Sequence, residues 1–381
     1  MSEDRNKFDQ NTKIPPEMFD LLNQTEIKDE IFKTKPIGFF RDSMNRFRKN
    51  KAAIVAFWII IIIILLSIFG PALNEYGWND QNIRRRNMPP RIPVLENIGI
   101  ANGARLLHNR RLDVLDDLSR YPEGSVIGVR NERYVMDVAM GDVLVNYYIY
   151  RGMEDEYFWF GTDALGRDIL TRLFRGSRIS LIIAFVSVAV NLVIGALVGA
   201  IIGYYGGKVD MISMRAIEII NGIPWLVMIV LFVLFVGTGM WALIGALVIR
   251  GWIGTMFIMR AQFYRFKGRE YVLAARTQGV PDRKLIFRHI MPNTLAPLIT
   301  ASMFAVPGAI FTEAFLAFIG LGLAPPEPSI GILLADGQRV LLHYPFLTVI
   351  PAVLISVLIL SFNLFANGLR DALDPTMRGE E

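Results

Sequence analysis

Long apolar segments alternate with polar stretches along the chain, and their lengths point to membrane-spanning helices. A helix needs about 20 consecutive apolar residues to cross the hydrocarbon core of a bilayer. Six segments come close to that length, at residues 52–70, 179–204, 217–236, 240–263, 294–320 and 346–369. Hydrophobic residues make up 53% of the 381-residue chain, and its mean hydropathy is +0.39. We therefore predict an all-α polytopic membrane protein with six transmembrane helices.

Glycine and proline positions inside these segments predict how the helices pack and bend. Every fourth residue is glycine at Gly195, Gly199 and Gly203, so the three share one helix face and allow a neighbouring helix to approach closely. Kinks are predicted at the prolines inside three other segments, Pro224, Pro307 and Pro351.

Basic residues near the ends of the segments predict the orientation of the chain. The Lys- and Arg-rich sequence before the first apolar segment favours a cytoplasmic N-terminal segment at 1–50 and a first transmembrane helix at 51–71. An even number of spans returns the tail, residues 371–381, to the cytoplasm. Four basic residues agree with this orientation: Lys208, Arg215, Arg370 and Arg378. Four other arginines lie on the predicted outer side: Arg167, Arg172, Arg175 and Arg178. They do not exclude this orientation, because a long loop crosses the membrane largely regardless of its charge.

Between the first two spans, residues 72–178 form a loop too long to be a simple connection. Leucines recur at helical spacing in residues 104–120, which predicts a helix ended by Pro122. Residues 125–152 are rich in β-formers and predict two or three short strands, punctuated by Gly128, Asn131 and the Gly141-Asp142 pair. We expect a small extracellular α+β domain. It would either contact an extracellular binding protein or shield the mouth of a pore.

A basic loop at residues 264–292 separates the fourth and fifth spans. Seven Lys and Arg residues face only two acids there, which is typical of a cytoplasmic connection. Gly279 ends a short helical stretch and Pro281 allows a second helix to begin, so we predict a helix, a tight turn and a helix. Such a wedge suits the docking of a soluble partner. The alternative is a basic amphipathic loop that contacts only lipid headgroups.

Composition and missing motifs exclude several classes of function. The chain has no cysteine and only three histidines, so thiolate sites are excluded and a His-rich metal site is not expected. The Gly206-Gly207-Lys208 run lacks the remainder of a phosphate-binding loop, so the sequence contains no nucleotide-binding motif of that kind. The net charge of +5 is explained by membrane orientation and requires no nucleic acid. The spans carry no convergent catalytic set.

The sequence EYVLAARTQGVPDRKLIFRHIMP, residues 270–292, resembles the coupling segment of ABC-importer permeases, which is written E-A-A-x3-G-x9-I-x-L-P. Four residues match at the right spacing: Ala274, Ala275, Gly279 and Pro292. Leu273 stands where the family often has Glu, His289 where many members have Ile, and Met291 where Leu is usual. Histidine at that position is similar to the oligopeptide, dipeptide and nickel branch of the family.

Further stretches carry the same resemblance in the same order. They are FGTDALGRDILTRLFRGSRISL at 160–181, GYYGGKVDMISMR at 203–215, AFLAFIGLGLAPPEPSIG at 314–331 and NLFANGLRDALDP at 363–375. The departures include Thr171 for Ser and Ile330 for Trp. The first 159 residues resemble the family only in having one span.

The resemblance implies the type I ABC-importer fold, with a five-span core at 179–370. It also implies one of two homologous permease subunits of a peptide importer in the plasma (inner) membrane. The implied partners are two ATP-binding subunits, which hold the ATP and Mg, and an extracellular substrate-binding protein or lipoprotein, so this chain itself binds no cofactor. The residues expected to couple to the ATPase are Glu270, Ala274, Ala275, Gly279, Asp282, His289 and Pro292.

Charged side chains inside the spans are expected to face protein or a water-filled path, because charge at bilayer depth is costly. Arg250 lies near the middle of the fourth span, and Glu313 in the fifth span is its predicted partner. Glu218 is predicted to meet Arg260. These residues would form stabilising ion pairs, or Arg250 would face the substrate and bind a peptide carboxylate.

Two other transport functions stay open at this point. A nickel importer of the same family would differ mainly in its binding protein. An ion-coupled secondary transporter would also carry intramembrane Arg and Glu, but it would be expected to show paired inverted repeats. No internal repeat is visible in the sequence.

Overall fold

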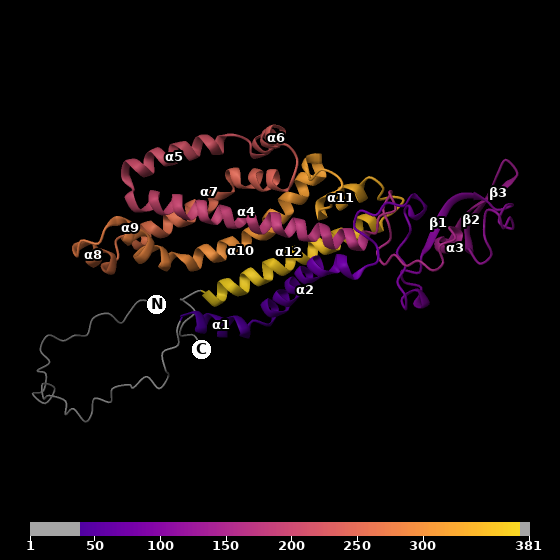
Figure 1. The fold of residues 1–381 in the computed structure, drawn as a ribbon, viewed down its shortest axis with the longest axis horizontal. Helices are drawn as coiled ribbons and strands as arrows, with labels where there is room; N and C mark the ends of the chain where they lie inside the picture. Colours follow the sequence, from indigo (N-terminus) through magenta and orange to yellow (C-terminus); the bar gives the residue numbers. More distant parts are fainter. Residues whose placement is uncertain (1–38, 374–381) are drawn as a thin grey trace, which may run out of the picture. The chain divides into compact units, whose positions relative to one another are not determined.

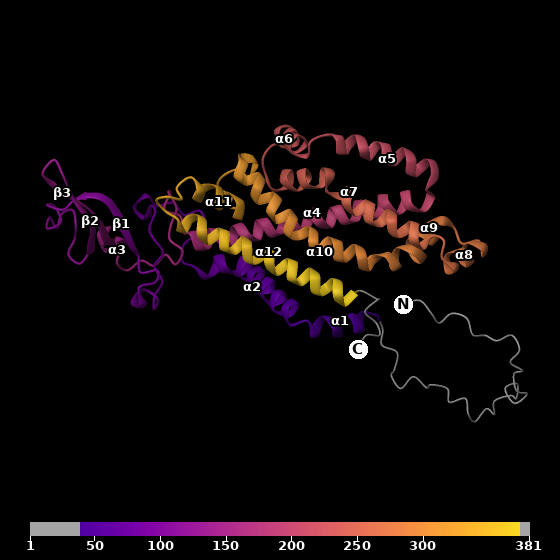
Figure 2. The same cartoon turned by 180° about the vertical axis from the view of Figure 1, so that it is seen from behind.

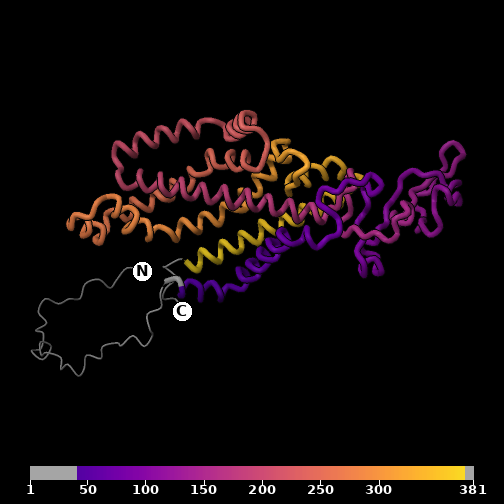
Figure 3. Tube along the Cα trace, in the orientation of Figure 1, coloured from indigo at the N-terminus to yellow at the C-terminus, as the bar shows by residue number. Residues whose placement is uncertain are grey.

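The computed structural model describes residues 39–373. Residues 1–38 of the predicted cytoplasmic segment and 374–381 of the predicted tail lie outside this range. The described chain begins with α1 (Phe39–Lys49) and α2 (Lys51–Leu73), and it ends with α12 (Phe346–Leu373). Figure 3 traces the path of the chain, with α2 and α12 side by side although they lie at opposite ends of the sequence.

The long helices form one bundle around α4 (Ile169–Tyr205). This helix packs against α2, α7 (Met240–Phe266) and α10 (Met291–Leu316), and α12 packs against α2 and α10 (Figure 1). Five helices in residues 39–373 are long and apolar enough to cross a membrane, and a sixth crossing results if the bent pair α5 and α6 forms one span. The prediction of a multi-span helical membrane protein is therefore confirmed.

The third predicted span is not one straight helix. Instead of a continuous helix over 217–236, α5 (Gly207–Gly222) and α6 (Trp225–Val236) meet at an angle of 80°. Pro224 explains the break, because proline lacks a backbone N–H and disfavours helical geometry in the residue before it. Ile223 accordingly has an extended backbone, with ψ at 128°. The prolines at 307 and 351 lie inside α10 and α12.

The second span begins at Ile169, well before the predicted residue 179. Asp168 caps the helix by accepting a hydrogen bond from the backbone N–H of Thr171 at 2.8 Å. The polar first turns are buried against other segments, and Arg172 is only 2% exposed. Hydropathy alone missed these turns because their arginines and serines are polar although they are packed inside the protein.

The segments around α10 contain wider helical turns. A short α9 (Asp282–Lys284) and a π-helical stretch at Leu285–Ile290 lead into α10, and a second π-helical stretch follows at Ala317–Leu321. The short helix α11 (Ile330–Gln338) then packs against α12.

Four apolar clusters hold the bundle together, and the smallest joins α4, α5 and α7 through residues such as Ile202, Ile217 and Ile253. The three larger clusters also share a helix. The first joins α2, α4, α10 and α12 through residues such as Ile60, Leu181 and Phe362. A second joins α4, α7 and α10 to the segment between α7 and α10. The third joins α4 to α6 and α7. In all three, α4 contributes residues, so this helix is the common element of the core.

The predicted insertion between the first two spans contains a three-stranded antiparallel sheet, in the order β1 (Ala104–Arg111), β3 (Val138–Asn146), β2 (Val126–Val135). Its helical content is small, with 3-10 turns at Ile83–Arg85 and Glu96–Ile98 and a single turn α3 at Tyr147–Tyr150. The sheet lies at one end of the bundle, and α8 and α9 lie at the other end (Figures 1 and 2).

The predicted helix at 104–120 is wrong, because its first half is strand β1. Leu106 and Leu107 pair with Leu144 and Val143 of β3, so the leucines satisfy the period of a strand. Leu107 is 7% exposed and joins the core of the insertion, whereas Leu118 is 65% exposed. The strands predicted in residues 125–152 are present, but the hairpin turns at Met136 and Asp137, which both have positive φ. Of the predicted breaks, Gly128 and Asn131 lie at irregularities of the pairing between β2 and β3, and Gly141-Asp142 lies inside β3.

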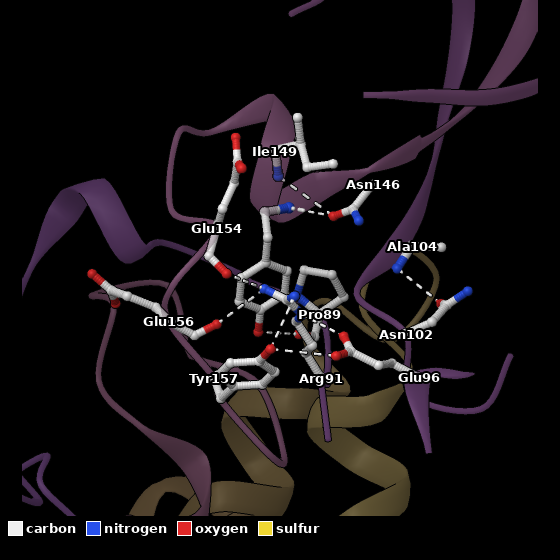
Figure 4. Close-up of polar contacts among 11 residues, drawn as sticks. Pro89, Arg91, Glu96, Asn102, Ala104, Asn146, Ile149, Glu154, Glu156 and Tyr157 are labelled. Atoms are coloured by element: carbon white, nitrogen blue, oxygen red, sulfur yellow. Dashed lines mark hydrogen bonds and ion pairs between the residues drawn. The ribbon is translucent and has the colours of Figure 1, made fainter. Parts of the chain in front are cut away.

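Arg91 connects the irregular parts of the insertion (Figure 4). Its guanidinium donates to the Glu96 carboxylate at 2.7 Å, to the Glu154 carbonyl at 2.6 Å and to the Tyr157 hydroxyl at 3.3 Å. It also stacks over the ring of Tyr148, 5.0 Å from the centroid, and the hydroxyl of this buried tyrosine donates to Pro89 O. Burial raises the pKa of Tyr148 above its ordinary value. One cation therefore fixes three loops at the edge of the sheet.

Candidate functional site

The segment between α7 and α10 folds as a helix, a tight turn and a second helix. Helix α8 (Glu270–Thr277) is followed by Gly279, whose φ of +77° lies in the left-handed region that favours glycine. After Pro281, α9 begins at Asp282. We call residues 270–284 the wedge.

The wedge has a packed inner side and an open outer side. Val272 and Ala275 are buried against Phe263 of α7 and Ile290. The exposed side carries four of the residues predicted to couple to an ATPase: Glu270, Ala274, Gly279 and Asp282. Ala275, the fifth predicted residue of the wedge, faces inward, so its small side chain serves packing rather than the open surface.

Polar contacts attach the wedge to the end of α4. The Tyr204 hydroxyl donates to the Asp282 carboxylate and accepts a hydrogen bond from Arg276 at 3.1 Å. Lys267 donates to the carbonyl of Gly203 at 2.9 Å. Tyr204 could not be found from the sequence, because no local pattern shows that its side chain meets a loop more than seventy residues later.

The other two predicted coupling residues follow the wedge in sequence, with His289 in the π-helical stretch and Pro292 in the first turn of α10. The carbonyl of half-buried His289 accepts a hydrogen bond from the Asn293 side chain at 2.9 Å, and the same amide reaches the Tyr271 hydroxyl at 3.2 Å. Pro292 is exposed in the first turn of α10. The link between α8 and α10 is thus made by Asn293 and Tyr271, and neither His289 nor Pro292 belongs to the wedge.

The glycine stripe on α4 lies against α7. A Cβ atom added to Gly195 would lie 2.6 Å from the carbonyl oxygen of Trp252, and one added to Gly203 would lie 2.6 Å from Cβ of Phe263. At Gly199 the nearest atom would be the carbonyl oxygen of Met256, at 2.5 Å. These distances are too short for any side chain, so glycine is what allows the two helices to approach.

The predicted partnership between Arg250 and Glu313 is wrong. Arg250 donates from Nε to the side-chain oxygen of Asn221 at 3.0 Å and from Nη1 to the carbonyl of Ile223 at 3.3 Å, at the end of α5. Glu313 is fully buried and accepts a hydrogen bond from Ser180 at 2.8 Å. The two residues belong to different helix interfaces, which sequence position alone does not show.

The predicted pair of Glu218 and Arg260 is also wrong. Arg260 makes a bidentate pair with Asp210, at 2.6 and 2.7 Å, and thereby connects α7 to the first turn of α5. Glu218 pairs instead with Arg215 on the exposed side of α5, at 2.7 Å. Asp210 was missed because it lies outside the apolar segment that the hydropathy pattern assigned to the third span.

A polar cluster surrounds the start of α4. Arg167 pairs with Asp163 at 2.7 Å, and Asp168 accepts a hydrogen bond from Asn74 at 2.8 Å. Burial raises the pKa of Asp168 above its ordinary value. The cluster therefore connects the end of α2 to α4.

Metal-binding residues do not gather in the described part of the chain. Within residues 39–373, no group of three or more His, Cys, Asp or Glu side chains is arranged to hold a metal ion. The polar groups described above are instead paired with one another across helix interfaces.

Comparison with known proteins places this architecture in a family. Residues 195–379 match the model of the binding-protein-dependent transport system inner membrane component. Residues 38–90 match the N-terminal TM domain of oligopeptide transport permease C. The oligopeptide transport system permease protein OppC of Bacillus subtilis is 33% identical over 365 residues, which cover 96% of this chain and 99% of that protein. The chain belongs to the binding-protein-dependent transport permease family.

Other relatives of this permease cover most of its length. The dipeptide transport system permease protein DppC of Lactococcus lactis is 35% identical over 345 residues, covering 89% of the permease and 91% of the relative. Among solved structures, the inward-facing MetNI methionine ABC transporter matches with a TM-score of 0.44 and 19% identity, covering 53% of the permease and 96% of the matched chain.

Proposed function

We propose that this chain is the permease subunit of an ATP-driven importer of peptides, and that it forms the translocation path with a second, homologous permease subunit. The relatives reported above are named for oligopeptide and dipeptide transport, and they align with nearly the whole chain. Those names favour peptides over nickel as the cargo. The bundle supplies the helices that could cross a membrane, five in residues 39–373 or six if α5 and α6 form one span.

The observation that carries this proposal is the wedge, which is exposed on one side and packed on the other. One of the two ATP-binding subunits, which hold ATP and Mg, would receive its open face in a groove, and the second ATP-binding subunit would meet the other permease. Val272 and Ala275 would pass their motion to α7 and α10, because both side chains are buried in the cluster that joins these helices.

Docking of the wedge to an ATP-binding subunit implies an orientation of the chain in the plasma (inner) membrane. The wedge and both termini would lie in the cytoplasm, and the sheet would lie outside, at the opposite end of the bundle (Figure 1). An extracellular substrate-binding protein or lipoprotein would deliver the peptide on that side. Membrane lipid would surround the exposed apolar faces of the helices.

The direct test is gentle purification of the chain from its native membrane, followed by mass spectrometry of the attached proteins and by peptide uptake assays. We expect a second permease and one or two ATPases that carry a phosphate-binding loop, together with uptake that stops on ATP depletion. Recovery of the chain alone, from a preparation that preserves other complexes, would contradict the proposal. Uptake that survives ATP depletion but collapses with the ion gradient would indicate a secondary transporter.

A matched pair of substitutions tests the wedge itself. Gly279→Asp places a carboxylate on the open face, at a φ of +77° that strains any side chain, so Gly279→Ala is included as the control that carries the same strain without the charge. Gly268→Asp adds the same charge earlier in the same loop, where an added Cβ likewise meets no heavy atom within 4 Å. We expect Gly279→Asp to abolish uptake and ATPase recovery without changing the amount of chain in the membrane. Gly268→Asp should retain both. Normal uptake by the Gly279→Asp variant would refute the docking role.

A further inference from the structure

A cavity lies beside Arg250, at the break between α5 and α6. Its volume is about 230 Å³, and its walls include Trp225 and Ile229 of α6, Leu247 of α7 and Thr312 of α10. Pockets for drug-sized ligands begin near 300 Å³, so this cavity suits one end of a longer molecule rather than a whole one. Among the described residues that line it, Arg250 alone is charged.

The guanidinium of Arg250 has unused donors. It carries five N–H groups, and two of its nitrogens are engaged, Nε by Asn221 and Nη1 by the carbonyl of Ile223. Within residues 39–373 no carboxylate forms an ion pair with it, since Glu313 binds Ser180 and Glu218 binds Arg215. A cation in a span without an acidic partner marks a place where an anion is expected.

The two existing hydrogen bonds also hold the guanidinium in place. A side chain that is already ordered loses little conformational freedom when it binds a ligand. The remaining N–H groups form part of a planar fork whose spacing matches the two oxygens of a carboxylate. The apolar walls around it would accept the hydrocarbon part of the residue that carries this carboxylate.

We infer that Arg250 and the adjoining cavity bind the C-terminal carboxylate of the peptide during its passage through the permease. This site rests on the proposed peptide import and adds its chemical specificity: the free carboxylate is recognised by Arg250, and the last side chain contacts Trp225, Ile229 and Leu247. The exposed arginine of α5, Arg215, has no such role because it already pairs with Glu218.

The test uses the complete transporter, purified with its ATPases and binding protein and reconstituted in phosphatidylcholine vesicles. Two tripeptides are compared that differ only in ending with a carboxylate or a carboxamide. Each is supplied at a concentration that saturates the binding protein, so that selection by that protein does not enter the ratio. The wild-type complex should import the carboxylate form about tenfold faster, as expected for one charge-assisted hydrogen bond.

Arg250→Gln should lower uptake of the carboxylate peptide to the level of the carboxamide peptide and leave carboxamide uptake unchanged. Glutamine keeps a donor for the carbonyl of Ile223, so the break between α5 and α6 retains one of its contacts. Arg250→Lys should keep part of the preference, because the charge remains without the fork. Arg215→Gln, the control, should keep the wild-type ratio.

Three results would overturn the site. The first is a wild-type complex that does not prefer the carboxylate peptide, or an Arg250→Gln variant that keeps the preference. The second is an equal loss of both peptides in that variant, which would assign Arg250 only to holding the end of α5. The third is that added phosphatidylglycerol raises the melting temperature of the wild-type complex but not that of Arg250→Gln, while both complexes import the two peptides in the same ratio. This result would assign the cavity to a lipid headgroup. Import of neither peptide by the wild-type complex would instead refute the proposed function itself, and the site with it.

Discussion

Replacing Gly199 by alanine tests the close approach of α4 and α7 with a single methyl group. The added Cβ would lie 2.5 Å from the carbonyl oxygen of Met256 and 2.8 Å from Cβ of Met259. Ordinary contacts between such atoms begin near 3.5 Å, so α7 would have to move by roughly 1 Å. Both nearest atoms belong to the backbone or to its first side-chain atom, and no rotamer change relieves the contact.

The loss of stability in Gly199→Ala can be estimated by comparison with a control variant. Gly254→Ala also replaces a helical glycine by alanine, but its Cβ would meet no heavy atom within 4 Å. Each variant gains about 1 kcal/mol of helix propensity, and this gain cancels in the difference between them. The remainder is the cost of overpacking, about 1–3 kcal/mol. At about 2 °C per kcal/mol, Gly199→Ala should melt roughly 2–6 °C below Gly254→Ala.

Thermal unfolding of the purified chain in detergent measures this difference, with both variants heated at the same scan rate because membrane proteins often unfold irreversibly. Gly195→Ala and Gly203→Ala should behave like Gly199→Ala, since their added Cβ atoms would meet α7 at similar distances. Equal melting temperatures for Gly199→Ala and Gly254→Ala would refute the packing argument.

Two other substitutions test the buried polar contacts. Glu313→Gln should change the free energy of unfolding by no more than about 1 kcal/mol, because an amide oxygen can keep the hydrogen bond with Ser180. Glu313→Ala should lower it by about 2–4 kcal/mol, because the hydrogen bond is lost and a cavity is left. Equal losses in both variants, measured by thermal unfolding, would show that the carboxylate itself is required. Tyr204→Phe removes the hydroxyl that holds Asp282, so amide hydrogen exchange in the wedge should accelerate by up to about tenfold. Tyr205→Phe, at a side chain that is 53% exposed, should leave that exchange unchanged, and acceleration by both variants would contradict the assignment.

The positions of the spans could be predicted because the thickness of the bilayer requires an apolar run of about 20 residues, which is visible in the sequence. Apolar runs located α2, α7, α10 and α12 to within a few residues. The bend between α5 and α6 was less predictable, since Pro224 signals a kink but not its angle. The early start of α4 was hidden because Arg172, although polar, is buried by neighbouring segments that hydropathy does not see.

Side-chain partners were the least predictable part of the site. Arg260 meets Asp210, fifty positions away in sequence, because the rotation of α5 turns Asp210 rather than Glu218 toward α7. That rotation depends on packing against other helices and is not encoded in the spacing of charges alone. The turn at Gly279 was predictable, since its geometry is local and glycine is the residue that adopts it most readily.

Strand β1 shows a different limit. Leu107 and Leu112 are five positions apart, which would place them on opposite faces of a regular strand, yet both contact the core of the insertion. The pairing of β1 with β3 shifts between Leu107 and Arg110, and this shift decides in favour of the strand. The partner strand lies about thirty residues later, beyond the reach of local periodicity.

The length of α4 has a mechanical consequence. With 37 residues, it is roughly 55 Å long, whereas the hydrocarbon core of a bilayer is about 30 Å thick. At one end Asp168 is bonded to Asn74 beside the insertion, and at the other Tyr204 is bonded to Asp282 in the wedge. A single stiff rod thus joins the two faces of the membrane without an intervening hinge. In the proposed orientation, a displacement of the wedge by the ATPase would move α4 along its axis and would shift the insertion on the outer side at the same time. The cytoplasmic and extracellular ends of the permease would therefore move together.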